Sequence, residues 1–454
     1  MVSDYMSQAE QAKQKLDRVS PCMCLAKWQQ TSLHLTTGMT NSCYHPPLHS
    51  IDQRAIKTNP SALHNTVEKK QQRQQMIDGI RPDGCSYCWR MEDNGKMSDR
   101  LMRSGEPWAI EEYENILANP QADVVPTYVE VDFNNACNFK CSYCSPQFST
   151  AWAQEVDEQG AYPTQPPHND ATHFQGQNKV LPQKNNPYVE AFWQWWPDLY
   201  PKLKHFRMTG GEPMMDKNTY KVFQYVIDNP KQDLHLNVTS NFCPPNQQLS
   251  DQYFDMVKQI CDQQLVEHFM QFVSLDAWGS RAEYIRHGMT FDTVMDNVNR
   301  YLTDIPGRNS LTFIITLNNL SVSSLKTMMV HILELRERYS STYQRVWFDT
   351  PILRQPEWQH IGLLDASFNH YFEEAIQYMR EHQHVSDMVA FRDFEIIKME
   401  RAQQIMMQGI EDKHIHKANF WRFFRTHDAR RGTDLINTFP EYRTFFGDCQ
   451  QATR

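Results

Sequence analysis

Residues 128–144 read YVEVDFNNACNFKCSYC. The first part alternates β-branched or aromatic residues with polar ones, which predicts a strand over 128–133. The second part places Cys137, Cys141 and Cys144 in a C-x3-C-x2-C spacing on the loop that follows. Thiolates select iron-sulfur clusters or zinc, and three of them leave one metal position open. We therefore predict a metal site with a free coordination position, with a structural zinc site as the alternative.

Further β-rich runs follow this strand, and amphipathic stretches separate them. Strands are predicted at 205–209, 234–239, 269–275, 311–317 and 345–348. Helices are predicted between them at 220–228, 253–263, 291–303 and 325–339. Parallel strands need crossover helices of this kind. The pattern predicts an α/β fold built on a partial, open (β/α)6 TIM-like barrel.

A second motif lies at residues 208–213, which read MTGGEP and follow the second predicted strand. Glycines allow a backbone to approach a ligand closely, although an ordinary β-turn would explain these letters taken alone. Their position, at the end of the strand after the cysteine triad, favours a functional segment. The triad, with Tyr143 before its last cysteine, together with this segment resembles the signature of the radical S-adenosylmethionine (SAM) superfamily.

This resemblance implies that the three cysteines hold a catalytic 4Fe-4S cluster that binds SAM at its open iron. It also implies SAM contacts from the segment after the second strand and from the polar residues after the third and fourth strands. The cofactor-binding residues expected on this basis are Tyr143, Gly210, Gly211, Glu212, Pro213, Ser240, Asn241, Ser274, Asp276 and Arg286. Arg286 would pair with the SAM carboxylate; an ordinary arginine on a helix surface is the alternative.

The N-terminal segment carries a second cysteine group. Cys24, Gly38 and Cys43 have the spacing C-x13-G-x4-C, and Cys85 and Cys88 follow as C-x2-C. This resembles the twitch (short SPASM-like) pattern, which implies an auxiliary 4Fe-4S cluster held by these four cysteines. A zinc knuckle is the alternative.

The first ligand of this second group is open between two cysteines. Cys22 also satisfies the spacing, and Cys24 is preferred because it places Trp28 as in the group's Cys-Pro-x-Pro-Trp opening. Leu25 and Lys27 stand where that opening has its prolines. After Cys88 the chain repeats the group's Trp-x2-Glu-x2-Gly-x2-Ser-x-Arg run, with Trp89, Glu92, Gly95, Ser98 and Arg100. Near Cys43, His45 and His49 are interpreted as loop residues.

Three domains are predicted. They are an auxiliary-cluster domain over 1–120, the barrel over 121–355 and a helical C-terminal extension over 356–454. Residues 145–186, rich in Gln, Pro, Asn and His, are interpreted as an inserted loop or lid. The C-terminal aromatics Phe420, Trp421, Phe423 and Phe424 are expected to pack in a core rather than to form a partner surface. Residues 428–432, DARRG, also resemble a segment of the same group.

Composition limits the other classes of function. The chain has 454 residues and a formal net charge of −9, which argues against a general nucleic-acid binder. It contains no apolar run long enough for a membrane span, and no signal peptide is recognised, so a cytoplasmic protein is expected. Eleven cysteines are too few for a disulfide scaffold of this length.

The resemblance implies an enzyme that reductively cleaves SAM to a 5'-deoxyadenosyl radical. A peptide or protein is the expected substrate, because SPASM and twitch relatives commonly modify peptides; a small metabolite is the second candidate. A reductant such as ferredoxin or flavodoxin would supply the electron. The competing class is a non-enzymatic zinc-binding scaffold.

Overall fold

The computed structural model describes residues 2–175, 179–340, 342–386 and 388–454. The chain forms two compact units. The first contains residues 1–134, 179–210 and 229–237; the second contains 135–178, 211–228 and 238–454. The three predicted domain ranges remain a prediction.

In the first unit, the sheet order is β6-β4-β1-β2-β3. Strand β4 pairs in parallel with both β6 and β1, whereas β1-β2 and β2-β3 are antiparallel. The strands are β1 (Gln30–His34), β2 (Met39–Asn41), β3 (His49–Ser50), β4 (Tyr128–Asp132) and β6 (His205–Thr209). Strand β7 (Lys231–Ser240) is shared, with residues up to 237 in the first unit and the rest in the second.

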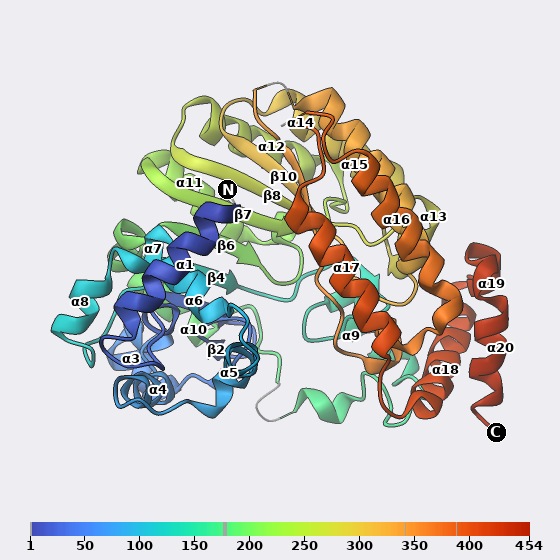
Figure 1. Ribbon diagram of the computed structural model, residues 1–454, viewed down its shortest axis with the longest axis horizontal. Coiled ribbons are helices and arrows are strands. Elements are labelled where there is room, and N and C mark those ends of the chain that lie inside the picture. Colours follow the sequence, from blue (N-terminus) through green and yellow to red (C-terminus); the bar gives the residue numbers. More distant parts are fainter. Residues whose placement is uncertain (1, 176–178, 341, 387) are drawn as a thin grey trace. The chain divides into compact units, whose positions relative to one another are not determined.

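The helices of the first unit surround a core of buried residues that includes Trp28, Trp89 and Trp108. Helices α1 and α6 lie side by side (Figure 1). The helices are α1 (Val2–Leu16), α2 (Ala26–Gln29), α3 (Gln53–Thr58), α4 (Val67–Ile77), α5 (Ser86–Asp93), α6 (Asp99–Gly105), α7 (Pro107–Ile110), α8 (Tyr113–Ala118) and α10 (Pro187–Leu199).

In the second unit, β8 (Val266–Ser274), β10 (Asn309–Ile314) and β11 (Val346–Asp349) form parallel pairs in the order β8-β10-β11. A separate antiparallel pair joins β5 (Lys140–Cys141) to β9 (Arg286–His287). The crossover helices are α11 (Lys217–Asp228), α12 (Gln247–Asp262), α14 (Phe291–Asp304) and α15 (Leu325–Tyr339). Two shorter helices are α9 (Thr150–Gln159) and α13 (Ser280–Ile285).

The end of the chain is helical, as predicted. Its helices are α16 (Asn369–Glu381), α17 (Asp393–Gln408), α18 (Lys413–Arg431), α19 (Leu435–Thr438) and α20 (Arg443–Gln451). Helices α18 and α20 pack together (Figure 1). Phe420, Phe423 and Phe424 are fully buried, which confirms the core interpretation, while Trp421 is partly exposed.

All six predicted strands are present, as β4, β6, β7, β8, β10 and β11, and the described fold is mixed α/β with mostly parallel pairs. Closure into a partial barrel stays a prediction. The inserted segment is not wholly loop, because it contains α9. In the part of the chain that the structure describes, no helix has the length and hydropathy needed to cross a bilayer.

Gly38, the glycine of the predicted auxiliary pattern, precedes β2 in the first unit. Its φ is +69°, and a Cβ there would lie 2.2 Å from ring atoms of the buried Tyr188. Gly95 has a similar φ of +68° but open space around it. An added side chain would strain the backbone at both glycines, but it would clash with a neighbouring side chain only at Gly38.

We predict that Gly38→Ala lowers the free energy of unfolding by at least about 1 kcal/mol more than Gly95→Ala, because both strain the backbone but only Gly38→Ala overpacks the core. Urea unfolding of both variants measures the difference. Equal losses would contradict the packing of Tyr188 on Gly38.

Candidate functional site

The loop that carries the cysteine triad is held by a short antiparallel ladder. Cys141, on β5, stands opposite Arg286 on β9, and Lys140 stands opposite His287. The backbone N–H of Ser142 donates to the carbonyl of Ile285 at 2.8 Å. This pairing places Arg286 at the cysteine loop rather than on a helix surface.

Helix α9 supports the other side of the same loop. Ser149 caps this helix by accepting from the N–H of Trp152, and its hydroxyl donates to the carbonyl of Phe139 at 2.6 Å. The indole Nε1 of Trp152, which is fully buried, donates to the carbonyl of Cys141 at 3.0 Å. Helix α9 was not predicted, because residues 145–186 were interpreted as a loop or lid; serine is a residue type favoured at the N-cap position that Ser149 occupies.

Of the three cysteines, Cys141 is buried and Cys137 and Cys144 are partly buried. Burial raises the pKa of Cys137 well above its usual value, and negative charge on Cys141, Glu212 and Cys144 would raise it further. Burial also raises the pKa of Cys144, to about 12. For Cys141, burial raises the pKa and the Arg286 guanidinium is the largest opposing effect. A positively charged metal centre is needed to hold these sulfurs as thiolates.

Among the residues that the structure describes, no three His, Cys, Asp or Glu side chains form a group that could hold a metal ion. A single zinc ion would gather its sulfur ligands at about 2.3 Å from one centre. An iron-sulfur cluster instead takes each cysteine on a different iron atom, which spaces the sulfurs more widely.

The GGEP segment is packed tightly against the cysteine loop. A Cβ on Gly211 would lie 2.3 Å from the carbonyl oxygen of Ala136, so only glycine fits there. The N–H of Glu212 donates to that same carbonyl at 2.6 Å. Gly210 has a φ of +107°, and Pro213 begins a 3-10 turn that runs to Met215. The glycines were expected to let the backbone approach a ligand closely. In the structure they let it approach the backbone of the cysteine loop.

The Glu212 carboxylate is 1% exposed and accepts three hydrogen bonds from this chain. The donors are the hydroxyl of Ser240 at 2.7 Å, the N–H of Asn241 at 2.6 Å and the N–H of Met214 at 2.9 Å. Burial raises the Glu212 pKa to about 7, and these hydrogen bonds oppose it. The side chain of Asn241 also donates to Asn138 Oδ1, on the cysteine loop, at 3.0 Å.

Asp276 is the centre of a second buried group. Its carboxylate accepts from the hydroxyl of Tyr143 at 2.7 Å, from Arg286 Nη2 at 2.9 Å and from the N–H of Thr316 at 2.9 Å. Arg286 Nη1 also lies 3.7 Å from Cys141 Sγ. Ser274, at the end of β8, is half-buried and takes no part in these contacts. Of the predicted SAM contacts, Tyr143, Asp276 and Arg286 are therefore brought together and Ser274 is not.

The four auxiliary cysteines line one cavity in the first unit. It is bordered by Cys24, Cys43, Cys85 and Cys88, and its volume is about 30 Å³. A cluster bound there would require these segments to part slightly. Burial raises the pKa of Cys24 to about 11, with further increases from charge on Cys43 and Cys85.

Two polar atoms at this cavity are left without a partner. Ser42 Oγ and His45 Nδ1 are buried and accept or donate no hydrogen bond within the described chain. Buried polar groups are normally satisfied, so these atoms fit a site that receives a ligand. His45 is in a bend, as expected of a loop residue. His49 lies in strand β3, so its interpretation as a loop residue was wrong.

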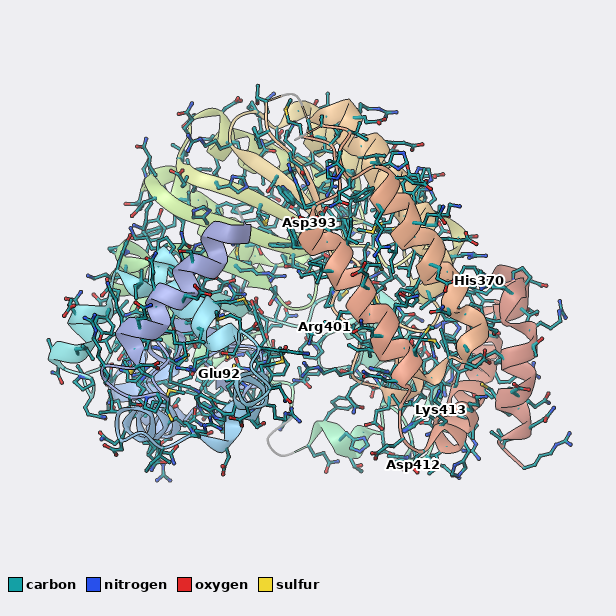
Figure 2. All side chains as sticks on the ribbon, viewed as in Figure 1. Glu92, His370, Asp393, Arg401, Asp412 and Lys413 are labelled. Atoms are coloured by element: carbon teal, nitrogen blue, oxygen red, sulfur yellow. The ribbon has the colours of Figure 1, made fainter. Side chains whose placement is uncertain are left out.

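The structure separates Cys22 from Cys24. Cys22 Sγ donates to the carbonyl of Gly79 at 3.3 Å and does not border the cavity. The run after Cys88 forms a buried network: Arg100 Nη2 pairs with Glu92, labelled in Figure 2, at 2.6 Å, and the hydroxyl of Ser98 donates to the same carboxylate. Arg100 also donates to the backbone carbonyl of Met23, next to Cys24.

Comparison with known proteins gives one curated relative. No protein-family model matches the chain. GTP 3',8-cyclase of Campylobacter lari, a radical SAM enzyme, is 26% identical over 124 residues. Part of this chain is therefore similar to part of a radical SAM enzyme.

The match covers 27% of this chain and 30% of the cyclase, so the chain spans less than a third of the relative's length. Among solved structures, Streptococcus suis SuiB bound to precursor peptide SuiA has a TM-score of 0.34 at 11% identity. That alignment covers 78% of this chain and 70% of SuiB, and its TM-score is too low to establish a common fold.

Glu212 generates a pH prediction for the metal-free protein. Its pKa is about 7 in the folded chain against 4.5 when unperturbed, so the folded state binds more protons between these values. The free energy of unfolding therefore falls as pH rises through this window, by up to about 3 kcal/mol from this group. Glu212→Gln cannot titrate and should lack this part of the fall. Chemical unfolding of both proteins across the window measures it, and parallel pH profiles would contradict the buried carboxylate.

Proposed function

We propose that the chain is a radical SAM enzyme that cleaves SAM reductively at a 4Fe-4S cluster held by Cys137, Cys141 and Cys144. The observation that supports it best is that three separate segments contact the cysteine loop: those after β6 and β7, and β9. Glu212 donates from its N–H to Ala136, Asn241 donates to Asn138, and Arg286 lies at Cys141 Sγ. A structural metal site needs none of these contacts.

When bound, the cluster and SAM would supply a 5'-deoxyadenosyl radical. The donor set fits this group: three thiols on one loop, one buried and two partly buried, leave one iron without a cysteine. Arg286 Nε is buried without a partner in the described chain, and this N–H is suited to the SAM carboxylate. A carboxylate offers about four acceptor positions, so Glu212 keeps one for an amino group after its three donors.

The remaining residues of the group act by positioning. Asp276 orients the Arg286 guanidinium and the Tyr143 hydroxyl through hydrogen bonds of 2.9 and 2.7 Å. Ser240 and the Asn241 backbone fix the Glu212 carboxylate. The buried Trp152 holds the Cys141 carbonyl through its indole N–H.

An auxiliary 4Fe-4S cluster held by Cys24, Cys43, Cys85 and Cys88 is the second part of the proposal. The support is the single cavity that these residues share and the unpartnered Ser42 and His45 atoms beside it. Four thiolates would saturate the cluster, which suits electron transfer rather than substrate binding.

A peptide or protein is the proposed substrate, on the resemblance of the N-terminal cysteine pattern to twitch domains. GTP 3',8-cyclase is named for a nucleotide substrate, so a small molecule is the second candidate. Cell extract that stimulates 5'-deoxyadenosine release should lose this effect after protease treatment. Stimulation that survives the protease would favour the small molecule.

We predict that Cys141→Ala abolishes 5'-deoxyadenosine formation and lowers the iron content of anaerobically reconstituted protein from about eight to about four, because one of two cubanes is lost. Cys449→Ala, which removes an isolated buried thiol, is the control and should keep both values. Retained SAM cleavage in Cys141→Ala would refute the catalytic assignment.

For the auxiliary site, Cys24→Ala should lower the iron content by about four while Cys22→Ala leaves it unchanged, since thiolates are the cluster ligands. Iron analysis of the two reconstituted variants makes the comparison. The opposite pattern would move the first ligand to Cys22, and no loss in either would remove the auxiliary cluster.

A further inference from the structure

Lys27 lies in the wall of the auxiliary cavity, one helical turn after Cys24. Its N–H donates to the Cys24 carbonyl at 3.1 Å, and the residue is 2% exposed. This chain thus has an ammonium group where the opening that it resembles has proline. Burying a lysine is costly unless an opposite charge compensates it.

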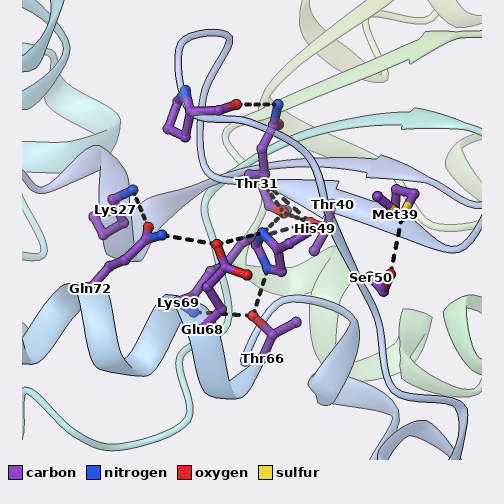
Figure 3. A network of polar contacts seen from close by, with 12 residues as sticks. Lys27, Thr31, Met39, Thr40, His49, Ser50, Thr66, Glu68, Lys69 and Gln72 are labelled. Atoms are coloured by element: carbon purple, nitrogen blue, oxygen red, sulfur yellow. Dashed lines mark hydrogen bonds and ion pairs between the residues drawn. The ribbon is translucent and has the colours of Figure 1, made fainter. Parts of the chain in front are cut away.

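No carboxylate in the described residues forms an ion pair with Lys27. The recorded hydrogen bond of its Nζ goes to the neutral Gln72 Oε1 at 2.8 Å, drawn in Figure 3. Gln72 in turn donates to Glu68 at 3.1 Å, but that carboxylate is one residue farther along the network and its side chain is 48% exposed. The nearby acid thus lies toward solvent, where its charge is screened.

The other charged groups at the cavity are already paired. Arg100 pairs with Glu92 at 2.6 Å and Arg103 with Glu106 at 3.2 Å. Asp99 lies 2.6 Å from His45 Nε2. Lys27 is therefore the cavity-lining cation, within the described chain, whose charge has no acidic partner.

Lys27 borders the same cavity as Cys24, Cys43, Cys85 and Cys88. Four cysteine thiolates around an iron-sulfur core leave a net negative charge, and one-electron reduction increases it.

We propose that Lys27 is the buried counter-charge of the auxiliary cluster, and that it favours cluster binding and raises the cluster's reduction potential. The inference rests on the proposed auxiliary cluster. A cation beside the cluster stabilises the more negative, reduced state more than the oxidised state. The chain would thereby make its second cluster a better electron acceptor.

The test uses the full chain with Cys137, Cys141 and Cys144 replaced by alanine, so that only the auxiliary cluster remains. Three substitutions are made separately in this parent protein. Lys27→Met and Lys27→Gln remove the charge, and Lys27→Arg keeps it. Lys57→Met, at an exposed lysine of α3, is the matched control. Iron content and the midpoint potential, followed by electron paramagnetic resonance in a redox titration, are the readouts, and circular dichroism checks folding.

We expect the neutral variants to shift the reduction equilibrium at least about tenfold toward the oxidised form, about 59 mV for one electron. Lys27→Arg and Lys57→Met should stay near the parent value. Loss of iron in both folded neutral variants but not in Lys27→Arg would equally support the counter-charge.

An unchanged potential with full iron in either neutral variant would overturn the inference, as would equal loss of iron in Lys27→Arg. A parent protein that binds no iron would instead overturn the auxiliary cluster itself. The two failures are therefore distinguishable.

Discussion

The buried carboxylate of Glu212 is the constraint on which the candidate site depends. It receives donors from the end of β7 and from its own turn, while its N–H is bound to the residue before Cys137. A carboxylate this deeply buried is costly unless its lone pairs are satisfied. Satisfying them fixes the GGEP turn, the Ser240 segment and the cysteine loop relative to one another.

The second buried carboxylate, Asp276, does the same for the other side of the loop. It orients Tyr143 and Arg286, and the β5-β9 pairing sets Arg286 opposite Cys141. The polar residues at the strand ends are thus positioned before any cofactor binds. Preorganisation of this kind reduces the cost of ordering side chains on binding.

In both cysteine groups, burial raises the pKa of thiols that would have to ionise to bind a cluster. Burial favours protonated thiols at both, so binding a metal cluster must release protons and depends on pH. The local cations differ, however. Arg286 at the triad is neutralised by Asp276, whereas Lys27 at the auxiliary cavity forms no ion pair with a carboxylate of the described residues.

The sequence predicted the strands well because runs such as Leu234–Val238 pair a clear period with buried apolar residues. It missed β1, whose Gln30, Thr31 and Ser32 are polar yet buried, since no hydrophobic alternation marks them. The cysteine spacing grouped Cys24, Cys43, Cys85 and Cys88, and in the structure these four residues border one cavity. Spacing alone also allowed Cys22, because it does not show which thiol the fold turns toward the cavity.

Contacts between residues far apart in the chain could not be predicted from the sequence either, because they depend on the tertiary fold. The pairing of Arg286 with Asp276 depends on β9 meeting β5, a contact that joins residues far apart in the chain. The support of the loop by Trp152 likewise needs α9 to fold back on Cys141. Local periodicity carries no information on either contact.

The most direct test of the central claim is made on the unaltered protein. It is reconstituted anaerobically with iron and sulfide, its iron is counted, and 5'-deoxyadenosine is measured after SAM and dithionite are added. The account predicts about eight irons, as two cubanes require, together with 5'-deoxyadenosine. Zinc in place of iron, with no SAM cleavage, would contradict it.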